Sequence, residues 1–239
     1  MLTPKTHSHS YTQIVTAPTC TEGGYTTYTC SVCGDSYKGS YVDPLGHDYK
    51  NGTCTRCGAK DPNYKPQADF TDVAPGSYCY DAVQWAVANG ITKGTDATHF
   101  SPNAGCTRGQ VVTFLWRAAG EPVVSGNVGF VDVAPGSYCY EAVNWAVANG
   151  ITKGTDATHF SPNATCTRGQ VVTFMYRAEG EPAVGGSNGF VDVAAGSYCY
   201  DAVQWAVANG ITNGTDATHF SPNATCTRGQ VVTFLYRAQ

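Results

Sequence analysis

Apolar residues recur at helical spacing over most of the chain, and the whole pattern occurs three times, beginning at Phe70, Phe130 and Phe190. In the first copy, Val83 and Ala86 share one face of a helix that we expect Ser77 to cap. Asn89-Gly90 is typical of the left-handed turn that ends such a helix. A turn-rich segment follows, and Phe100 is its expected anchor in the core. The pattern therefore predicts a short helix followed by a loop in each copy.

A second helix is predicted where Cys-Thr-Arg-Gly-Gln precedes an apolar run. Thr107 and Gln110 form a capping box, in which each side chain satisfies a free backbone N–H of the first turn. Arg108 and Gly109 do not fit, because a cation there faces the positive end of the helix dipole and glycine disfavours helices by roughly 1 kcal/mol. A helix start with free N–H groups and an adjacent arginine suits an anion. The alternative is an arginine paired with a neighbouring carboxylate. The corresponding candidates in the other copies are Arg168, Gly169, Arg228 and Gly229.

Each copy thus consists of a helix, a loop and a helix, at residues 70–120, 130–180 and 190–239. One pair of short helices cannot bury a core, so the three copies must share one. Because no polar capping repeat follows the third copy, we expect a closed pseudo-threefold bundle rather than an open solenoid. The predicted fold is mainly α, with a small β-hairpin module in front of it.

That front module, residues 1–62, is rich in Cys, His, Tyr and Thr and is followed by a linker at residues 63–69. Two Cys-x-x-Cys-Gly knuckles are typical of a zinc ribbon, in which four soft ligands surround the ion. The first candidate set is Cys30, Cys33, Cys54 and Cys57. The alternative set is Cys20, Cys30, Cys33 and His47, which gains weight because His9-Ser-Tyr11 and His47-Asp-Tyr49 look like the starts of two units. Two alternatives to metal binding remain for these five cysteines: they form disulfides, or they neither bind metal nor form disulfides.

The other six cysteines lie in the repeats, two in each at a constant spacing. One disulfide per repeat is the arrangement expected in an oxidising compartment, and buried free thiols are the alternative. The predicted pairs are Cys79–Cys106, Cys139–Cys166 and Cys199–Cys226.

Composition adds mainly exclusions. The net charge is −4, and residues 70–239 contain eight Lys and Arg against twelve Asp and Glu, so no basic nucleic-acid face is indicated. No apolar run approaches the ~20 residues of a membrane span. The first residues contain no apolar signal core, so we expect either a cytosolic chain or a fragment of a longer secreted protein. His99, His159 and His219 recur in turns without an evident acid partner, and no catalytic set is apparent.

The repeats resemble S-layer homology motifs over about seventy per cent of the chain. The residues that carry the resemblance are Phe70-x-Asp-Val, Tyr78-Cys-Tyr-Asp-Ala-Val, Asn89-Gly-Ile, Phe100-Ser-Pro-Asn-Ala and Thr107-Arg-Gly-Gln. The resemblance implies a pseudo-trimer whose grooves bind secondary cell-wall polysaccharide, often pyruvylated. It also implies that Arg108, Arg168 and Arg228 face the anionic sugar, and that the two cysteines of each repeat lie near each other. Gly and Gln stand where the family has Ala and Glu. The front module resembles Cys/His-rich repeats of surface proteins from gut Firmicutes.

The expected function is therefore non-catalytic anchoring at an extracellular cell wall or S-layer, with wall polysaccharide as the partner. The arginines and the glycines that follow them are the predicted ligand-binding residues, flanked by Tyr78, Tyr138 and Tyr198. Zinc in the front module is the only cofactor predicted. The alternative is a surface adhesion protein that displays this module to a host or matrix protein.

Overall fold

The computed structural model describes residues 7–50, 52–64 and 68–239, and it divides the chain into two compact units, Met1–Pro66 and Gln67–Gln239. We call the first the N-terminal module and the second the repeat domain, and each is described by itself. Within the described residues, no helix combines the length and the apolar character that crossing a bilayer requires.

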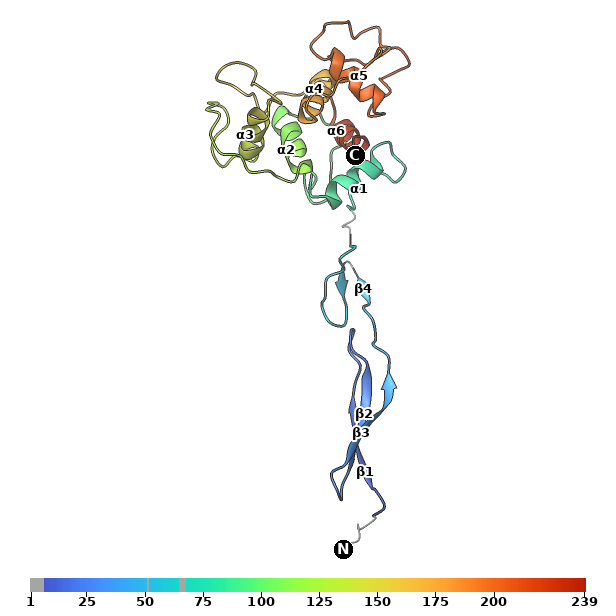
Figure 1. The fold of residues 1–239 in the computed structure, drawn as a ribbon. Helices are drawn as coiled ribbons and strands as arrows, with labels where there is room; N and C mark the ends of the chain where they lie inside the picture. The colour runs from blue at the N-terminus through green and yellow to red at the C-terminus, as the bar shows by residue number, and fades with distance from the viewer. Residues whose placement is uncertain (1–6, 51, 65–67) are drawn as a thin grey trace. The chain divides into compact units, whose positions relative to one another are not determined.

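The described residues of the N-terminal module form two small antiparallel sheets (Figure 1). The first has the strand order β1-β2-β3, and Tyr11 on β1 lies opposite Cys30 on β2. Its strands are β1 (Tyr11–Thr16), β2 (Gly24–Cys30) and β3 (Ser36–Val42), and the second sheet pairs β4 (Tyr49–Lys50) with β5 (Thr53–Cys54). The strands β1 and β3 are exposed along nearly their whole length. In the described part of the module, the buried apolar residues are Cys20, Cys30 and Cys54, as expected for a unit that needs a staple.

Over residues 68–239, the repeat domain contains six helices, two per repeat. They are α1 (Tyr80–Ala88), α2 (Arg108–Ala118), α3 (Tyr140–Ala148), α4 (Arg168–Ala178), α5 (Tyr200–Ala208) and α6 (Arg228–Arg237). The capping box is present in full at the start of α2, α4 and α6, which confirms the prediction made from the Thr and Gln spacing. The arginine is the first helical residue in all three helices.

The start of α1 was predicted incorrectly. The helix begins at Tyr80, its N-cap is Cys79, and no side chain caps it. Ser77 instead precedes the helix in a turn, in which its carbonyl accepts the N–H of Tyr80 at 3.0 Å. Residues 78 and 79, which would begin the helix if Ser77 were its N-cap, belong to this turn instead.

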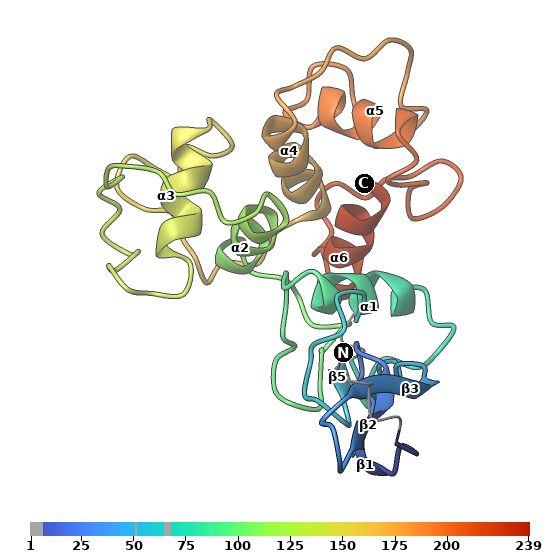
Figure 2. The same cartoon turned by 60° about the horizontal axis from the view of Figure 1, so that its bottom comes forward.

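The six helices form a closed ring. The second helices α2, α4 and α6 lie in the centre and the first helices lie outside them (Figure 2). Each first helix packs on the second helix of the preceding repeat: α3 on α2, α5 on α4 and α1 on α6. At the axis, the N–H of Cys106 donates to the carbonyl of Cys226, that of Cys226 to Cys166, and that of Cys166 to Cys106, each at 2.9 Å. The predicted closed pseudo-threefold bundle is confirmed.

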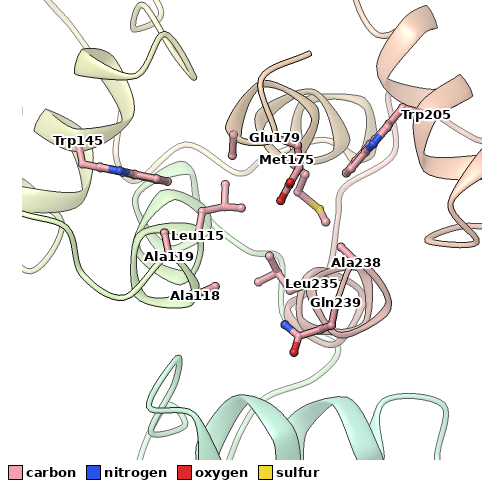
Figure 3. A pocket seen from close by; sticks show the side chains of 11 residues that line it. Leu115, Ala118, Ala119, Trp145, Met175, Glu179, Trp205, Leu235, Ala238 and Gln239 are labelled. Atoms are coloured by element: carbon pink, nitrogen blue, oxygen red, sulfur yellow. The ribbon is translucent and has the colours of Figure 1, made fainter. Parts of the chain in front are cut away.

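The core follows the same symmetry. Phe100, Phe160 and Phe220 are completely buried, as predicted for the first of them. Near the C-terminal ends of α2, α4 and α6 there is one hollow of about 160 Å³, toward which point Leu115, Met175 and Leu235 (Figure 3). Trp145 and Trp205 reach it from α3 and α5 (Figure 3). Trp85 packs on Tyr236 at 5.7 Å between ring centroids, so these indoles serve packing.

All eleven cysteines are free thiols in the structure, and the six of the repeats are buried. The free-thiol alternative is therefore the state seen here, and the bridges Cys79–Cys106, Cys139–Cys166 and Cys199–Cys226 are not formed. The ring explains this arrangement. Cys79 precedes α1, which packs on α6 of the third repeat, whereas Cys106 bonds to its two equivalents at the axis. Burial raises the pKa of Cys106 to about 12, so its thiol is neutral.

Candidate binding grooves and metal sites

Three similar grooves lie on the repeat domain, each between a second helix and residues of the neighbouring repeats. Their volumes are about 350, 250 and 360 Å³, near the lower limit for small-molecule pockets. Groove 1 is lined by Lys93, Phe114, Arg117, Tyr138 and Arg228 among others; groove 2 by Gln170, Thr173, Phe174, Arg177 and Tyr198; and groove 3 by Tyr78, Arg168, Asn213, Phe234 and Arg237 among others.

The predicted arginines are shared between repeats. Arg228 of the third repeat lines groove 1, which is built on the first repeat, and Arg168 of the second repeat lines groove 3. Arg108 holds the same position under groove 2, because its guanidinium lies 5.3 Å from the ring centroid of Phe174. The Nε of each arginine donates to the carbonyl of a phenylalanine in another repeat. For Arg108 and Arg168 this phenylalanine lies 52 residues later in the sequence, and for Arg228 it lies 128 residues earlier.

Each guanidinium is almost completely enclosed. Arg108 is 5% exposed, its Nε donates to the carbonyl of Phe160 at 2.9 Å, and its charge lies 4.8 Å over the ring of Phe160. Burial lowers the pKa of Arg108, and the carboxylate of Asp132 opposes this shift. Arginine remains charged in proteins, so each groove contains a desolvated cation.

One nitrogen of each guanidinium has no partner. Among the described residues, the Nη2 atoms of Arg108, Arg168 and Arg228 are buried without a hydrogen bond to protein. The sequence left open a carboxylate partner for each arginine as an alternative. Among the described residues, however, no carboxylate lies within ion-pair distance of these three arginines. A buried donor on a cation is expensive to leave unpaired, so this atom is suited to an anionic acceptor.

The backbone at the helix start is not available to a ligand, contrary to the sequence-based prediction. The N–H of Arg108 donates to the carbonyl of Ala164 at 2.8 Å, and that of Gly109 donates to Pro162 at 2.9 Å. The N–H of Gln110 is capped by Thr107. The loop of the next repeat therefore satisfies the helix N-terminus, and only side chains remain for an anion.

The tyrosines and glycines meet at these helix starts. Tyr78 lies over the start of α6, and its hydroxyl is 3.5 Å from that of Thr227. A side chain at Gly229 would collide with the Tyr78 hydroxyl. Glycine stands in place of the family's alanine because the tyrosine of another repeat occupies that volume. Gly109 with Tyr138 and Gly169 with Tyr198 repeat the arrangement.

A second set of cations was missed in the sequence. Arg117 lines groove 1, where its Nη1 donates to the carbonyl of Ile91 at 3.1 Å and its Nε lies 3.7 Å from Glu121. Arg177 and Arg237 line the other two grooves, and Lys93 lines groove 1. The threefold repetition of Arg117, Arg177 and Arg237 was visible in the sequence, but only the ring brings these residues beside the first arginines.

The histidines of the turns have an acid partner after all. His99 Nδ1 lies 3.1 Å from the carboxylate of Asp96, which also accepts the N–H groups of Thr98 and His99. The N–H of Thr98, followed by His99, lowers the pKa of Asp96 to about 2. Both side chains are about half exposed, so this pair closes an exposed turn and is not a buried catalytic dyad.

The N-terminal module brings its cysteines together with histidines in two separate groups. The first group is His7, His9, Cys30 and Cys33, and the second is Cys20, His47, Cys54 and Cys57, with all ligand atoms of each group within 4.8 Å of one another. Neither predicted ligand set is brought together as one group. In the first predicted set the two knuckles shared one ion. In the structure, the second cysteine of each knuckle instead lies beside a histidine that precedes that knuckle in the sequence. Cys33 Sγ lies 3.6 Å from His9 Nδ1, and Cys57 Sγ lies 3.4 Å from His47 Nδ1.

Both groups could hold a metal ion. The N–H of Cys33 is the main cause that lowers the pKa of Cys30 to about 5. Burial raises the pKa of Cys54, but the N–H groups of Cys57 and Arg56 outweigh it and bring the pKa to about 5. Each group therefore contains one buried sulfur that is a thiolate at neutral pH, the form that binds metals.

Comparison with known proteins identifies the repeat domain. Residues 69–112, 129–172 and 189–232 each match the S-layer homology domain, and together they make up more than half of the chain. The chain belongs to the S-layer homology family.

Among its relatives, a surface-layer 125 kDa protein of Lysinibacillus sphaericus is 32% identical over 67% of this chain and 14% of its own length. A cell surface protein of Thermoanaerobacter kivui is 30% identical over 46% of this chain and 15% of its own. An endoglucanase of a Bacillus species (strain KSM-635) is 28% identical over 67% of this chain and 18% of its own. The chain thus spans less than a fifth of the length of these relatives.

S-layer homology domains are non-catalytic and anchor proteins to the cell wall by binding its polysaccharide. With its surface-layer and cell-surface relatives, the family places this chain at the cell surface. The chain therefore carries a wall-anchoring domain.

Proposed function

We propose that the three grooves anchor the chain by binding an anionic wall polysaccharide that bears ketal-linked pyruvate. The observation that carries this proposal is the buried, unpartnered Nη2 of Arg108, Arg168 and Arg228 among the described residues. A pyruvate carboxylate can accept from that nitrogen and restore the hydrogen bond that the protein leaves unmade. The protein already orients the guanidinium through its Nε, so little freedom is lost on binding.

The distribution of charge supports the same ligand class. The eight Lys and Arg of residues 70–239 are the residues of the grooves or their equivalents in another repeat. They are Lys93, Lys153, Arg108, Arg117, Arg168, Arg177, Arg228 and Arg237. Clefts lined by one sign of charge concentrate the oppositely charged ligand. A domain with a surplus of acids therefore presents its positive potential at three places.

The aromatic side chains suit the sugar ring beside that carboxylate. Tyr78 and Phe234 line groove 3, and Tyr138 and Phe114 line groove 1. Tyr78 is 58% exposed although its hydroxyl is held near Thr227, so its ring is available for contact with a ligand.

The grooves are not identical. Lys93 lines groove 1, whereas the corresponding residue of groove 3 is Asn213. Arg117 in groove 1 has Glu121 beside it, but no described carboxylate lies within ion-pair distance of Arg237. The two differences offset each other in net charge, so we expect groove 3 to differ in how it positions the anion more than in its potential.

The test is binding of the full chain to purified wall polysaccharide, measured with intact polymer and with polymer depyruvylated by mild acid. The triple variant Arg108→Met, Arg168→Met, Arg228→Met should lose affinity by about 30-fold or more, since removing one partner of a buried charge pair costs roughly 2 kcal/mol at least. Depyruvylated polymer should bind the wild type and the variant equally weakly. A triple variant that binds intact polymer like the wild type refutes the proposal.

A matched control removes three cations from the N-terminal module, by Lys38→Met, Lys50→Met and Lys60→Met. This control changes the net charge by the same amount but leaves the grooves intact. Equal losses in both triple variants would mean that charge in general, and not the grooves, holds the polymer.

We further propose that the two Cys/His groups of the N-terminal module each hold zinc. Two or three thiolates with one or two imidazoles are the ligands of structural zinc sites, and four ligands in each group match its tetrahedral coordination. Native mass spectrometry of the full chain purified with zinc should show two bound ions. The same chain in denaturing solvent should show eleven reduced thiols.

A second candidate function is display of the N-terminal module to a protein partner. Apolar side chains on its first sheet are unusually exposed, including Ile14 (67%), Val15 (74%) and Tyr41 (72%). The full chain and the variant Ile14→Thr, Val15→Thr can be compared as baits for host or matrix proteins. Equal, weak capture by both would leave the module as a spacer.

A further inference from the structure

The two metal groups are built on the same local plan. His9 and His47 each lie two residues before a tyrosine on which the imidazole stacks, at 5.5 and 5.1 Å between ring centroids. Each is followed by a Cys-x-x-Cys-Gly knuckle, and the second cysteine of the knuckle faces the histidine Nδ1. We call residues 7–42 the first lobe and residues 43–64 the second lobe. Three ligands of each site therefore come from one lobe and occupy equivalent positions.

The fourth ligand breaks this equivalence. In the first lobe it is His7, whose Nε2 lies 3.6 Å from Cys30 Sγ. The residue at the same place in the second lobe is Leu45, which cannot bind a metal. Its role is taken by Cys20, which belongs to the first lobe and lies in the loop between β1 and β2. The second site is therefore assembled from both lobes.

The contacts around Cys20 fit a junction. Its Sγ lies 3.8 Å from Cys54 Sγ, and the side chain is 8% exposed. Beside it, the N–H of Leu45 donates to the carbonyl of Thr19 at 2.9 Å. The strands of the second lobe, β4 and β5, have two residues each, so its own sheet contributes little to ordering it.

The second lobe cannot fold on apolar burial alone. Among its described residues, Cys54 is the one buried side chain. A chain segment of this size without a core needs a cross-link or a metal to order it. The lobe is also shorter, because His9 and Cys33 are 24 positions apart whereas His47 and Cys57 are 10 apart. The missing residues correspond to the hairpin that carries Cys20 in the first lobe.

We propose that the second site is an interlobe zinc clip, in which Cys20 of the first lobe and His47, Cys54 and Cys57 of the second bind one ion. The inference rests on the zinc assignment above. The first site, with two imidazoles and two thiolates, orders the first lobe. The second, with one imidazole and three thiolates, orders the second lobe and joins it to the first.

The experiment combines native mass spectrometry with hydrogen exchange on the full chain purified with zinc. Cys20→Ser should retain one ion of two, and the amides of Cys54 and Gly58, which donate to Ala59 and Cys54, should exchange at least about tenfold faster. Amides of the β2–β3 pairing should be unchanged. The matched control His7→Ala should also lose one ion, but should leave the second-lobe amides protected.

Each outcome decides a different claim. A wild-type chain that binds no zinc overturns the zinc assignment and the clip together. Two ions retained by Cys20→Ser, or second-lobe amides unaffected by it, overturn the clip alone. A wild-type mass lower by two hydrogens, with this difference lost in Cys20→Ser, would show that Cys20 forms a disulfide in place of binding the ion and would also overturn the clip.

Discussion

Replacing Arg108 by alanine and, separately, by methionine distinguishes the packing role of this residue from its ligand role. The side chain is 5% exposed and fills the space between the rings of Phe160 and Phe174, at 4.8 and 5.3 Å. Both variants remove the charge, the Nε bond to the Phe160 carbonyl and the free Nη2. Only alanine also removes the long side chain that separates the rings.

The expected changes in unfolding free energy follow from three terms that the two variants share and one that differs. Both variants leave the Phe160 carbonyl without its donor, at about 1–3 kcal/mol, and both lose the contact of a cation with aromatic rings, at about 0.5–2 kcal/mol. Both also relieve the desolvation of a buried charge, which offsets these losses by several kcal/mol. The cavity term, about 3 kcal/mol, belongs to alanine alone. We expect Arg108→Met to be within about 1 kcal/mol of the wild type and Arg108→Ala to be about 3 kcal/mol less stable than Arg108→Met.

Urea unfolding followed by tryptophan fluorescence measures this difference in the full chain. All four tryptophans lie in the repeat domain, at residues 85, 116, 145 and 205, so the signal reports on that domain alone. Equal free energies of unfolding for the two variants would refute the packing role. Undiminished polymer binding at groove 2 in Arg108→Met would refute the ligand role, whatever the stability.

Four further predictions concern the same domain. Gly169→Ala should cost about 1 kcal/mol of unfolding free energy, since overpacking against the Tyr198 hydroxyl exceeds the gain in helix propensity; adding Tyr198→Phe should recover most of it. Asp132→Ala should cost about 3 kcal/mol by urea unfolding, because its carboxylate accepts two backbone N–H groups at 2.9 and 2.7 Å. Lys93→Asn, which copies the residue of groove 3, should weaken polymer binding by a few-fold and flatten its salt dependence; an unchanged salt slope would contradict it. The pKa of Asp96 is lowered to about 2, so its ionised carboxylate stabilises the fold fully above pH ~4, and this stabilisation is lost as the pH falls through 2. The melting temperature of Asp96→Asn should therefore fall less steeply than that of the wild type over that range.

Much of the repeat domain was determined by local sequence. The Thr and Gln spacing set the start of α2, α4 and α6, because a capping box involves residues three apart. The threefold recurrence of the pattern, and the absence of enough apolar surface in one copy, implied a shared core. The start of α1 was misjudged because the turn that precedes it competes with a serine cap for the same residues.

The metal groups show where local reasoning stops. The knuckles were recognisable because a Cys-x-x-Cys-Gly turn is a property of adjacent residues. Their partners were not, because His9 is 24 positions from Cys33 and Cys20 is 34 from Cys54. The pairing depends on how the hairpins fold back, and the repeated His-x-Tyr pattern indicated two units without showing which fourth ligand each would use.

By itself, the sequence singled out Arg108, Arg168 and Arg228 as residues that a helix start does not explain. It also suggested that they bind an anion through the helix N-terminus, which is wrong, since carbonyls of the next repeat occupy those N–H groups. Only the closed ring decided that each arginine lies under an aromatic pair of a neighbouring repeat, and that cations spread evenly along the chain gather in three grooves. The reason is that each first helix packs on the second helix of another repeat, so every groove is made of residues that no local pattern can connect.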